Sequence, residues 1–564
     1  MNDFKQSVVN IPEICVQHGV NDIVLCPGSR SAPLALAFLR HPATRCRTIV
    51  DERSAGYIGL GLAQFYRKPV GLVCTSGTAA LNFAPAVVEA FYQRIPLVVF
   101  TADRPPEWID QEDGQTIHQC DLFVPHCHIS LNTPVDDSHP DAKWHFQRLI
   151  SDAINTSIRK RGPVHINVPL REPLYPAADF ASEEIGCIRL ADTVEELSAD
   201  MWDELKGEWQ QAKRRLVIVG LSAWDDAMNA ALANVADQLK VPVLADITSN
   251  IKGFTHPAWF DAFLDTSDRD VLSRLRPDLV VKLGGPVVSK SLKLMLRRSR
   301  PEHIWLLQDE PKVIDTFKGA TRLLPVSLLP FIKALPEKIS ATGNGEYFST
   351  WSRHDEKAGR ILTVKLADLD FCEIAVMHKV LQQLPDYGNL HLGNSSIVRL
   401  ASMVGFIPGS RQQVFSNRGT SGIDGILSTA VGSALASQVL TTVILGDLSF
   451  FYDRNALWNR YVPEHLRVVV FNNDGGGIFR LLEGSRELPE LNHHFEVEHG
   501  LSAEMTAKEH GLEYLQCNDW RSLEACLPQL FREKSGPALL EIFFDKNVSS
   551  RAFFEFKSEI EEIK

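Results

Sequence analysis

The chain has 564 residues, which at about 150 residues per domain suggests three or four compact units. Hydrophobic residues make up 45% of the chain and charged residues 23%, an ordinary globular composition that excludes a disordered or fibrous protein. The formal net charge of −12 argues against nucleic acid and anionic membrane surfaces as partners.

Nothing in the sequence predicts an anchor in a membrane. No apolar run reaches the roughly 18 residues that a membrane-spanning helix needs. The start of the chain, MNDFKQSVVNIPEIC, has no apolar core of the kind found in a secretory signal. The ten cysteines form no CxxC pair, which fits reduced thiols. We therefore expect a cytoplasmic protein.

The N-terminal third alternates apolar, β-branched runs with amphipathic stretches. Strands are predicted over 23–26, 48–50, 70–74 and 97–100, and helices over 34–39, 55–63 and 79–90. The strands run into polar or small residues: PGSRS, DER, TSGT and TADRPP. Such alternation predicts a parallel sheet that binds ligands at the carboxyl ends of its strands. Arg30, Glu52, Thr78 and Arg104 all follow a predicted strand end.

Two further βα series follow, and we predict α/β architecture throughout, with doubly wound parallel sheets in three domains. A Pro-rich, acidic stretch over 171–188 and a polar stretch over 336–346 are predicted boundaries. The middle series has predicted strands over 216–220, 241–245, 279–285 and 304–307. Its first turn lacks the later glycines of a dinucleotide fingerprint, which argues against NAD or FAD. The last series has predicted strands over 390–392, 414–416, 443–445, 468–471 and 539–544.

Hard oxygen donors follow two neighbouring strands of the last series. GDLS, which begins at Gly446, follows one strand, and NNDGGG, which begins at Asn472, follows the next, with one helix predicted between them over 455–461. Each motif alone is a common turn. Together they offer a carboxylate, an amide oxygen and a flexible glycine carbonyl, a set that Mg²⁺ prefers when it bridges a protein to a diphosphate.

GDLS followed by NNDGGG resembles the metal and diphosphate signature of thiamin-diphosphate enzymes, whose usual form is GDG and then NN. These enzymes also carry a glutamate at a strand end in another domain, and Glu52 in VDERSAGYIGLGLA matches it. PGSRS, TSGTA, TADRPPE, LGGPV, SNRGTSGIDG and NNDGGGIF extend the resemblance along the chain, to the branch that serves menaquinone biosynthesis. The resemblance implies a pyrimidine-binding domain over 1–183, a central Rossmann-like domain over 184–345 and a diphosphate- and Mg²⁺-binding domain over 346–564.

The resemblance implies a role for each matching residue. Glu52 is the expected catalytic residue, because its carboxyl would bind the pyrimidine ring and promote loss of a proton from the thiazolium carbon. An apolar pocket should then raise its pKa. Ile423 matches the apolar wedge that keeps the cofactor bent. The expected cofactor contacts are Glu52, Thr78, Ser395, Ile423, Gly446, Asp447, Leu448 and Asn473. The expected ligands of Mg²⁺, or of Mn²⁺ in its place, are Asp447, Asn473 and Gly475.

Implied substrates are 2-oxoglutarate, which is decarboxylated, and isochorismate, to which the resulting carbanion adds. Both are dianions, and arginine is the natural partner of a carboxylate. The expected substrate contacts are Arg30, Arg104, Gln115, Lys290, Ser395, Arg399, Arg418, Ile478 and Phe479. Ser291 stands where a second basic residue is expected, so one carboxylate contact stays open. Family precedent implies a homodimer or homotetramer, with Glu52 of one subunit facing the Asp447 site of another.

Alternative interpretations remain. A thiamin enzyme of the acetolactate-synthase type would act on pyruvate and would need fewer arginines. A non-catalytic regulator that binds a nucleotide or diphosphate would have no use for Glu52. Any single arginine can instead form a surface salt bridge, for example Arg104 with Asp103. His118, Cys120, His126, Cys127 and His128 lack zinc-site spacing, and we expect no metal there.

Overall fold

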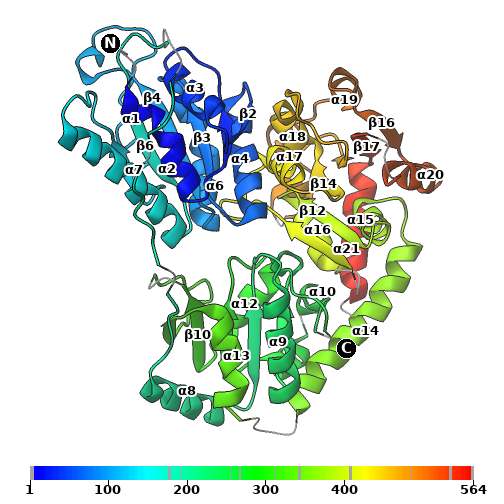
Figure 1. Cartoon of the computed structure of the whole chain (residues 1–564). Coiled ribbons are helices and arrows are strands. Elements are labelled where there is room, and N and C mark those ends of the chain that lie inside the picture. The colour runs from blue at the N-terminus through cyan, green and yellow to red at the C-terminus, as the bar shows by residue number, and fades with distance from the viewer. Residues whose placement is uncertain are drawn as a thin grey trace.

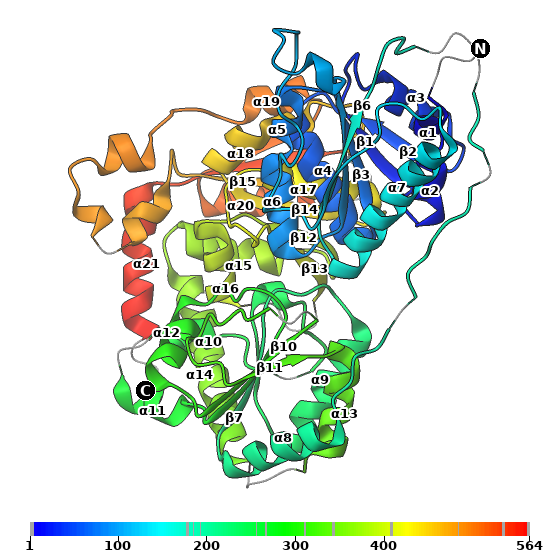
Figure 2. The same cartoon turned by 90° about the vertical axis from the view of Figure 1, so that its left-hand side faces the viewer.

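The computed structural model describes residues 5–175, 180–183, 185–191, 193–254, 256–265, 268–309, 312–340, 345–405, 410–482, 484–532 and 536–560. It contains three parallel sheets, of six, five and six strands in chain order. In Figure 1 the first body (blue to cyan) and the third (yellow to red) lie beside each other, and the middle body (green) lies below both. Figure 2 gives the same arrangement from the side. The predicted α/β class with three parallel sheets is confirmed.

The first sheet has the strand order β2-β1-β3-β4-β6-β5. Its strands are β1 (Asp22–Leu25), β2 (Arg45–Thr48), β3 (Val70–Cys74), β4 (Leu97–Asp103), β5 (Ser130–Asn132) and β6 (Val164–Pro169). Its helices are α1 (Gln6–Val9), α2 (Ile11–Gln17), α3 (Ala32–Arg40), α4 (Glu52–Tyr66), α5 (Thr78–Asn82), α6 (Ala84–Gln93) and α7 (Pro140–Lys160), with a 3₁₀ turn at Pro106–Trp108. The single helix predicted over 79–90 is wrong. Helix α5 ends at Asn82, and a second helix, α6, begins after Phe83 with a proline in its first turn.

The middle sheet has the order β11-β10-β9-β7-β8. Its strands are β7 (Arg215–Val219), β8 (Val243–Ala245), β9 (Leu279–Leu283), β10 (His303–Gln308) and β11 (Arg322–Pro325). Its helices are α8 (Ala199–Gln211), α9 (Asp226–Leu239), α10 (Phe260–Leu264), α11 (Arg269–Leu275), α12 (Lys290–Ser299) and α13 (Leu328–Lys338), with a 3₁₀ turn at Ile247–Ser249. Helix α13 continues through Pro336, and residues 341–344 of the predicted boundary lie outside the described residues.

The third sheet, ordered β13-β12-β14-β15-β17-β16, has the same topology as the first. Its strands are β12 (Tyr387–Leu392), β13 (Arg411–Phe415), β14 (Thr441–Gly446), β15 (Leu466–Asn472), β16 (Glu513–Cys517) and β17 (Ala538–Phe543). Its longer helices are α14 (Glu346–Asp368), α15 (Glu373–Gln382), α16 (Ser396–Val404), α17 (Ile426–Ala436), α18 (Asp447–Asp453), α19 (Glu504–Glu509), α20 (Trp520–Leu530) and α21 (Lys546–Ile560). Short turns of 3₁₀ or π helix cover Arg454–Leu457, Gly477–Leu481, Ser485–Glu487 and Leu491–Glu496.

The helix between the two donor motifs differs from the prediction. It was expected over 455–461, but α18 begins at Asp447 itself, directly after β14. An acidic residue in the first turn of a helix is stabilised by the helix dipole. As a result, the GDLS motif forms a helix N-terminus rather than a loop.

Helices α4 and α17 join the first and third bodies. They contribute to one hydrophobic core that draws residues from both sheets. Gly61 of α4 and Gly432 of α17 allow the two backbones to touch, since a Cβ on Gly432 would lie 2.1 Å from the carbonyl oxygen of Ile58. No helix in the described ranges has the length and apolar character needed to cross a membrane.

Candidate active site

The Asp447 carboxylate lies at the centre of a polar cluster at the ends of β14 and β15, two strands that pair directly. Asp447 is 2% exposed. Its Oδ1 accepts a hydrogen bond from the Leu448 N–H at 2.6 Å, and its Oδ2 accepts from Asn473 N–H at 3.1 Å and Gly475 N–H at 2.9 Å. The structure thus brings together the three residues predicted to hold a cation.

Only one of the two polar side-chain atoms of Asn473 has a hydrogen-bond partner in the described structure. Its Nδ2 donates to Glu373 Oε1 at 2.5 Å, and Glu373 comes from the start of α15. Its Oδ1 is buried and has no hydrogen-bond partner in the described structure. Burial raises the pKa of Glu373 to about 7. A buried acceptor oxygen without a partner calls for a missing ligand, and beside a carboxylate it fits Mg²⁺.

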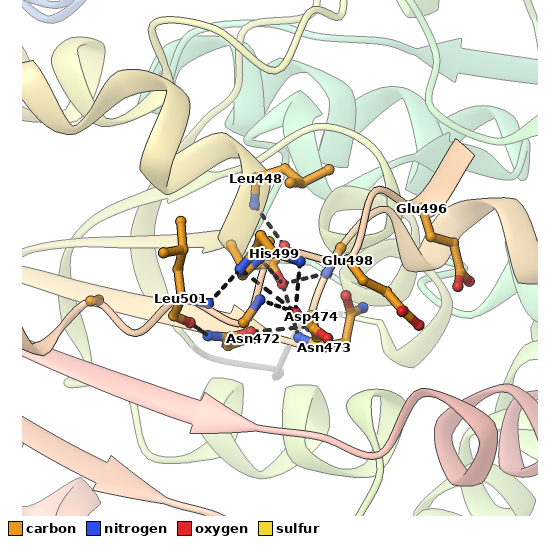
Figure 3. Close-up of polar contacts among 12 residues, drawn as sticks. Leu448, Asn472, Asn473, Asp474, Glu496, Glu498, His499 and Leu501 are labelled. Carbon is orange, nitrogen blue, oxygen red and sulfur yellow. Dashed lines mark hydrogen bonds and ion pairs between the residues drawn. The ribbon is translucent and has the colours of Figure 1, made fainter. Parts of the chain in front are cut away.

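His499 belongs to this cluster, and sequence reasoning missed it (Figure 3). Its Nδ1 accepts a hydrogen bond from Leu501 N–H at 2.8 Å, so its Nε2 carries the proton and lies 3.3 Å from Asp447 Oδ2. The Asp447 carboxylate raises the pKa of His499. Asp474 Oδ1 accepts from the N–H groups of His499, at 3.0 Å, and Gly500, at 2.7 Å. Segment 496–501 therefore braces the NNDGGG loop.

A cation here would be held by mixed donors. In the ranges that the structure describes, no three or more His, Cys, Asp or Glu side chains come close enough to hold a metal ion among themselves. Asp447 with an amide and a backbone carbonyl leaves coordination positions for phosphate oxygens and water, which suits Mg²⁺ bound to a diphosphate. Gly446 and Leu448 flank Asp447, and the N-terminus of α18 adds N–H groups of the kind that bind phosphate.

Glu52 is the first residue of α4 and is half-buried. The preceding Asp51 caps the helix by accepting from Arg53 N–H at 2.9 Å and Ser54 N–H at 3.2 Å. Burial raises the pKa of Glu52, as expected for a carboxyl that shares a proton. Asp51 Oδ2 also accepts from Asn455 Nδ2 at 2.7 Å. Within one chain the start of α4 therefore lies near the end of α18, whereas Asp447 lies at its beginning.

Polar groups at the strand ends of the first sheet form a second set. Arg30 is 6% exposed, and its Nη1 donates to Leu170 O at 3.0 Å. Arg104 Nη1 lies 3.1 Å from Asp113 Oδ2, so the guanidinium pairs with Asp113, whereas the Asp103 carboxylate accepts from the backbone N–H of Arg104. The Nε atoms of both arginines are buried and have no hydrogen-bond partner in the described ranges.

Thr78 and Gln115 lie side by side through Gly77. A Cβ on Gly77 would lie 3.3 Å from the backbone of Gln115, and Gly77 has a φ of +82° that favours glycine. Thr78 follows as the exposed first residue of α5. The two predicted contacts thus share one corner of the first sheet.

Ser395, Arg399 and Arg418 gather at the end of β12. Arg399 Nη1 donates to Ser395 O, and Arg418 Nη1 donates to Asn394 Oδ1 at 2.9 Å. Burial lowers the pKa of Arg418, and the neighbouring Arg399 lowers it further. Asp246, Glu89 and Asp261 lie near the two guanidinium groups, but among the described residues none of them forms an ion pair with either arginine, so both groups fit a dianionic ligand.

Helix α12 contributes a basic residue that the sequence did not single out. Lys290, the predicted contact, is exposed at the start of α12. Lys293, one turn later, is half-buried and donates to Val287 O at 3.0 Å. Its pKa is lowered by burial first and then by Arg418. Lys293 therefore places a positive charge near Arg418, on the same helix as Ser291.

The apolar side chains that were predicted to contact the cofactor or the substrates are only partly buried. Ile423 is 37% exposed, and Ile478 and Phe479 are half-buried in a 3₁₀ turn beside the NNDGGG loop. The ring of Phe479 lies 5.6 Å from that of Phe495. These side chains offer an apolar wall to a ligand or to another copy of the chain.

Comparisons with known proteins point in one direction. The N-terminal domain family of thiamine pyrophosphate enzymes matches residues 10–122, and a middle-domain family of thiamine pyrophosphate enzymes matches residues 190–392. The 2-succinyl-5-enolpyruvyl-6-hydroxy-3-cyclohexene-1-carboxylate synthase of Cytophaga hutchinsonii is 39% identical, over 99% of each chain. That of Flavobacterium johnsoniae is 38% identical, over 97% of this chain and 98% of the relative.

A solved structure supports the same fold. The benzoylformate decarboxylase of Polynucleobacter necessarius superposes with a TM-score of 0.69 over 96% of this chain and 99% of its own, at 17% identity. At that identity the likeness concerns the fold alone. Three parallel-sheet bodies of this kind are thus an arrangement seen in a solved decarboxylase.

Proposed function

The chain belongs to the family of thiamin-diphosphate-dependent 2-succinyl-5-enolpyruvyl-6-hydroxy-3-cyclohexene-1-carboxylate synthases, and from that premise we propose which residues serve the reaction. The protein is a transferase of menaquinone biosynthesis. Its proposed substrates are 2-oxoglutarate and isochorismate. The reaction releases CO₂ from the first substrate and adds the remaining succinyl unit to the ring alkene of the second.

One observation carries the assignment of the cofactor site. Asp447 and Asn473 end two paired strands, and the Asn473 Oδ1 oxygen is buried without a partner in the described structure. Asp447, Asn473 and the carbonyl of Gly475 would hold Mg²⁺, which would in turn bind the diphosphate; Mn²⁺ offers similar coordination. Gly446 and Leu448 would line the same end of the cofactor, and Ile423 would support its middle.

Glu52 would serve the other end of the cofactor. Thiamin diphosphate, when bound, supplies a nucleophilic carbon and takes up the electrons released by decarboxylation. The raised pKa of Glu52 suits a carboxyl that holds a proton against a ring nitrogen and returns it during turnover. Thr78 and Ser395 would complete the contacts to the cofactor.

The cations on the strand ends would bind the substrate carboxylates. Arg399 and Arg418 lie together, and Arg30 and Arg104 each keep a buried Nε without a partner in the described ranges. Gln115 and Lys290 would add polar contacts, and Ile478 and Phe479 would add an apolar wall. Because a guanidinium group can bind a carboxylate through two parallel hydrogen bonds, this set would favour dianions over the monoanion pyruvate.

The site would be completed by a second copy of the chain. Glu52 and Asp447 lie toward opposite ends of α18 in one chain, and large apolar side chains near them are exposed, among them Tyr452 and Trp458 at 52% each. A homodimer in which Glu52 of one copy faces Asp447 of the other would cover these surfaces, and a homotetramer would contain two such pairs. The domain limits at 183 and 345 and the cytoplasmic location stay predictions.

A direct assay tests the proposal. The purified chain is incubated with thiamin diphosphate, Mg²⁺ and either 2-oxoglutarate or pyruvate, with and without isochorismate, and CO₂ and products are measured by mass spectrometry. We expect CO₂ from 2-oxoglutarate and a product that carries the succinyl unit only when isochorismate is present. Preference for pyruvate would instead indicate an enzyme of the acetolactate-synthase type. Binding of the cofactor without turnover would indicate a regulator.

A further inference from the structure

Glu89 is a buried carboxylate of the first body that contacts a loop of the third. It lies on α6 and is 1% exposed. Its Oε1 accepts from Gly419 N–H at 2.7 Å, and its Oε2 accepts from Thr420 N–H at 2.7 Å and from Thr420 Oγ1 at 2.6 Å. A carboxylate removed from water is stable only when donors replace the water, and this loop supplies three of them.

The following turn of α6 extends the contact. Gln93 Nε2 donates to Glu89 Oε1 at 2.5 Å and to Ser416 O at 3.2 Å, while Gln93 Oε1 accepts from Gln64 Nε2 of α4 at 3.1 Å. A polar chain thus runs from α4 through α6 to both ends of segment 416–420. The hydrogen bond from Gln93 therefore helps to orient the Glu89 carboxylate toward the loop.

The loop fits tightly between two supports. A Cβ on Gly419 would lie 2.7 Å from the carbonyl oxygen of Glu89 and 3.0 Å from its Oε1. On the other side, Asn394 Nδ2 donates to Asn417 O and to Gly422 O, both at 2.7 Å. Loop 416–423 therefore takes its shape from Asn394 of its own body and from Glu89 of the first body.

Two residues of this loop have proposed roles in the site. Arg418 directly precedes the anchored Gly419, and Ile423 follows the anchored Thr420 by three residues. We propose that Glu89 is a positioning residue, which holds loop 416–423 in the shape that presents Arg418 to a substrate carboxylate and Ile423 to the cofactor. This inference rests on the proposed function, because it takes the roles of Arg418 and Ile423 from it. Glu89 itself would touch neither substrate nor cofactor.

Glu89→Gln separates anchoring from packing. Glutamine keeps the volume of the side chain, so no cavity forms in the core. Its Oε1 still accepts from Gly419 N–H, but its Nε2 then faces the Thr420 N–H, which leaves two donors opposed. The matched control is Tyr461→Phe, which removes another contact between the first and third bodies, from Thr48 N–H to Tyr461 Oη at 3.2 Å, away from the loop.

The experiment measures both the loop and the substrate. In the full-length protein with cofactor and Mg²⁺, we expect Glu89→Gln to raise the KM for 2-oxoglutarate by about tenfold or more, with a smaller fall in kcat. Amide hydrogen exchange in peptides covering 416–423 should be faster than in the wild type, whereas exchange over β12 and α17 should not change. Tyr461→Phe should leave the KM and the exchange of the loop as they are.

Each contrary result has its own meaning. Unchanged exchange in the loop of Glu89→Gln would overturn the anchoring, and faster exchange with an unchanged KM would overturn the link to the substrate. An equal rise in KM in Tyr461→Phe would also overturn it, since any contact between the bodies would then do the same. Arg418→Lys, measured in parallel, tests the proposed function separately: if it leaves the KM unchanged, the role of Arg418 fails, whatever the loop exchange shows.

Discussion

Gly61 of α4 and Thr429 of α17 bring two helix backbones into contact: a Cβ at position 61 would lie 2.0 Å from the carbonyl oxygen of Thr429. No side chain fits between the two backbones, so α4 of the first body and α17 of the third are in direct backbone contact. Because α4 begins with Glu52 and α17 follows the loop that carries Ile423, this contact fixes the spacing of two candidate site residues within one chain.

Gly61→Ala should therefore destabilise the protein. The added methyl group must displace the backbone of α17, and overpacking of this kind typically costs about 1–3 kcal/mol. We expect a lower midpoint in thermal unfolding followed by circular dichroism. Gly207→Ala is the matched control, since it lies within helix α8 and a Cβ there would meet nothing within 4 Å. That control should be neutral or stabilising by about 0.5–1 kcal/mol. Equal midpoints for both variants would contradict the close contact.

The sequence predicted the central strands well for a physical reason. Strands buried on both faces, such as β3 and β4, are continuous apolar runs. It missed β6, which is equally buried, because His165 and Asn167 interrupt its apolar pattern. Both side chains contact Thr101 Oγ1 at 2.8 Å, a pairing across strands that no local pattern reveals. The short edge strand β5 is partly exposed and has no pattern of its own.

The candidate site was predictable to the extent that it lies at strand ends. Asp447 and Asn473 follow apolar runs, and parallel topology alone brings them together. His499 lies in irregular chain 26 residues beyond Asn473, and only the tertiary fold brings it to Asp447. Lys293 was missed because the sequence does not tell which of the two lysines of α12 is half-buried and which is exposed.

Glu52→Gln should separate cofactor binding from turnover. The amide keeps the size of the side chain but cannot pass a proton, so we expect kcat to fall by about 100-fold or more while thiamin diphosphate still binds. Steady-state assays give kcat, and isothermal titration calorimetry gives the cofactor affinity. Turnover close to that of the wild type would remove Glu52 from the mechanism.

Asp447→Ala should abolish the retention of thiamin diphosphate that depends on Mg²⁺. The variant loses a carboxylate ligand and the acceptor for the N–H groups of Asn473 and Gly475. Cofactor content after dialysis with and without Mg²⁺ is the measurement. Glu498→Gln is the control, because Glu498 lies in the segment that braces the loop but its carboxylate pairs with Lys546 and not with the Asp447 site. Equal retention in wild type and Asp447→Ala would contradict the metal assignment.

Asp453→Asn should change how stability depends on pH. Asp453 is fully buried, its carboxylate accepts from Ser428 N–H and Oγ at 2.7 Å each, and burial raises its pKa to about 7 from a usual 3.8. Between those two values the folded state holds a proton that the unfolded state has released, so the wild type loses stability as pH rises through this range.

Asparagine keeps the shape and both contacts to Ser428 but does not titrate. The stability of the variant relative to the wild type should therefore increase from pH 5 to about pH 7 and then level off toward pH 8, by at most about 3 kcal/mol, because about two pH units are crossed at about 1.4 kcal/mol each. Thermal midpoints of both proteins, compared at each pH, measure this difference and cancel the titration of all other groups. A difference that stays constant with pH, or shrinks as pH rises, would show that Asp453 is ionised in the folded protein throughout this range, with its charge stabilised by the hydrogen bonds from Ser428 and by the nearby Arg53.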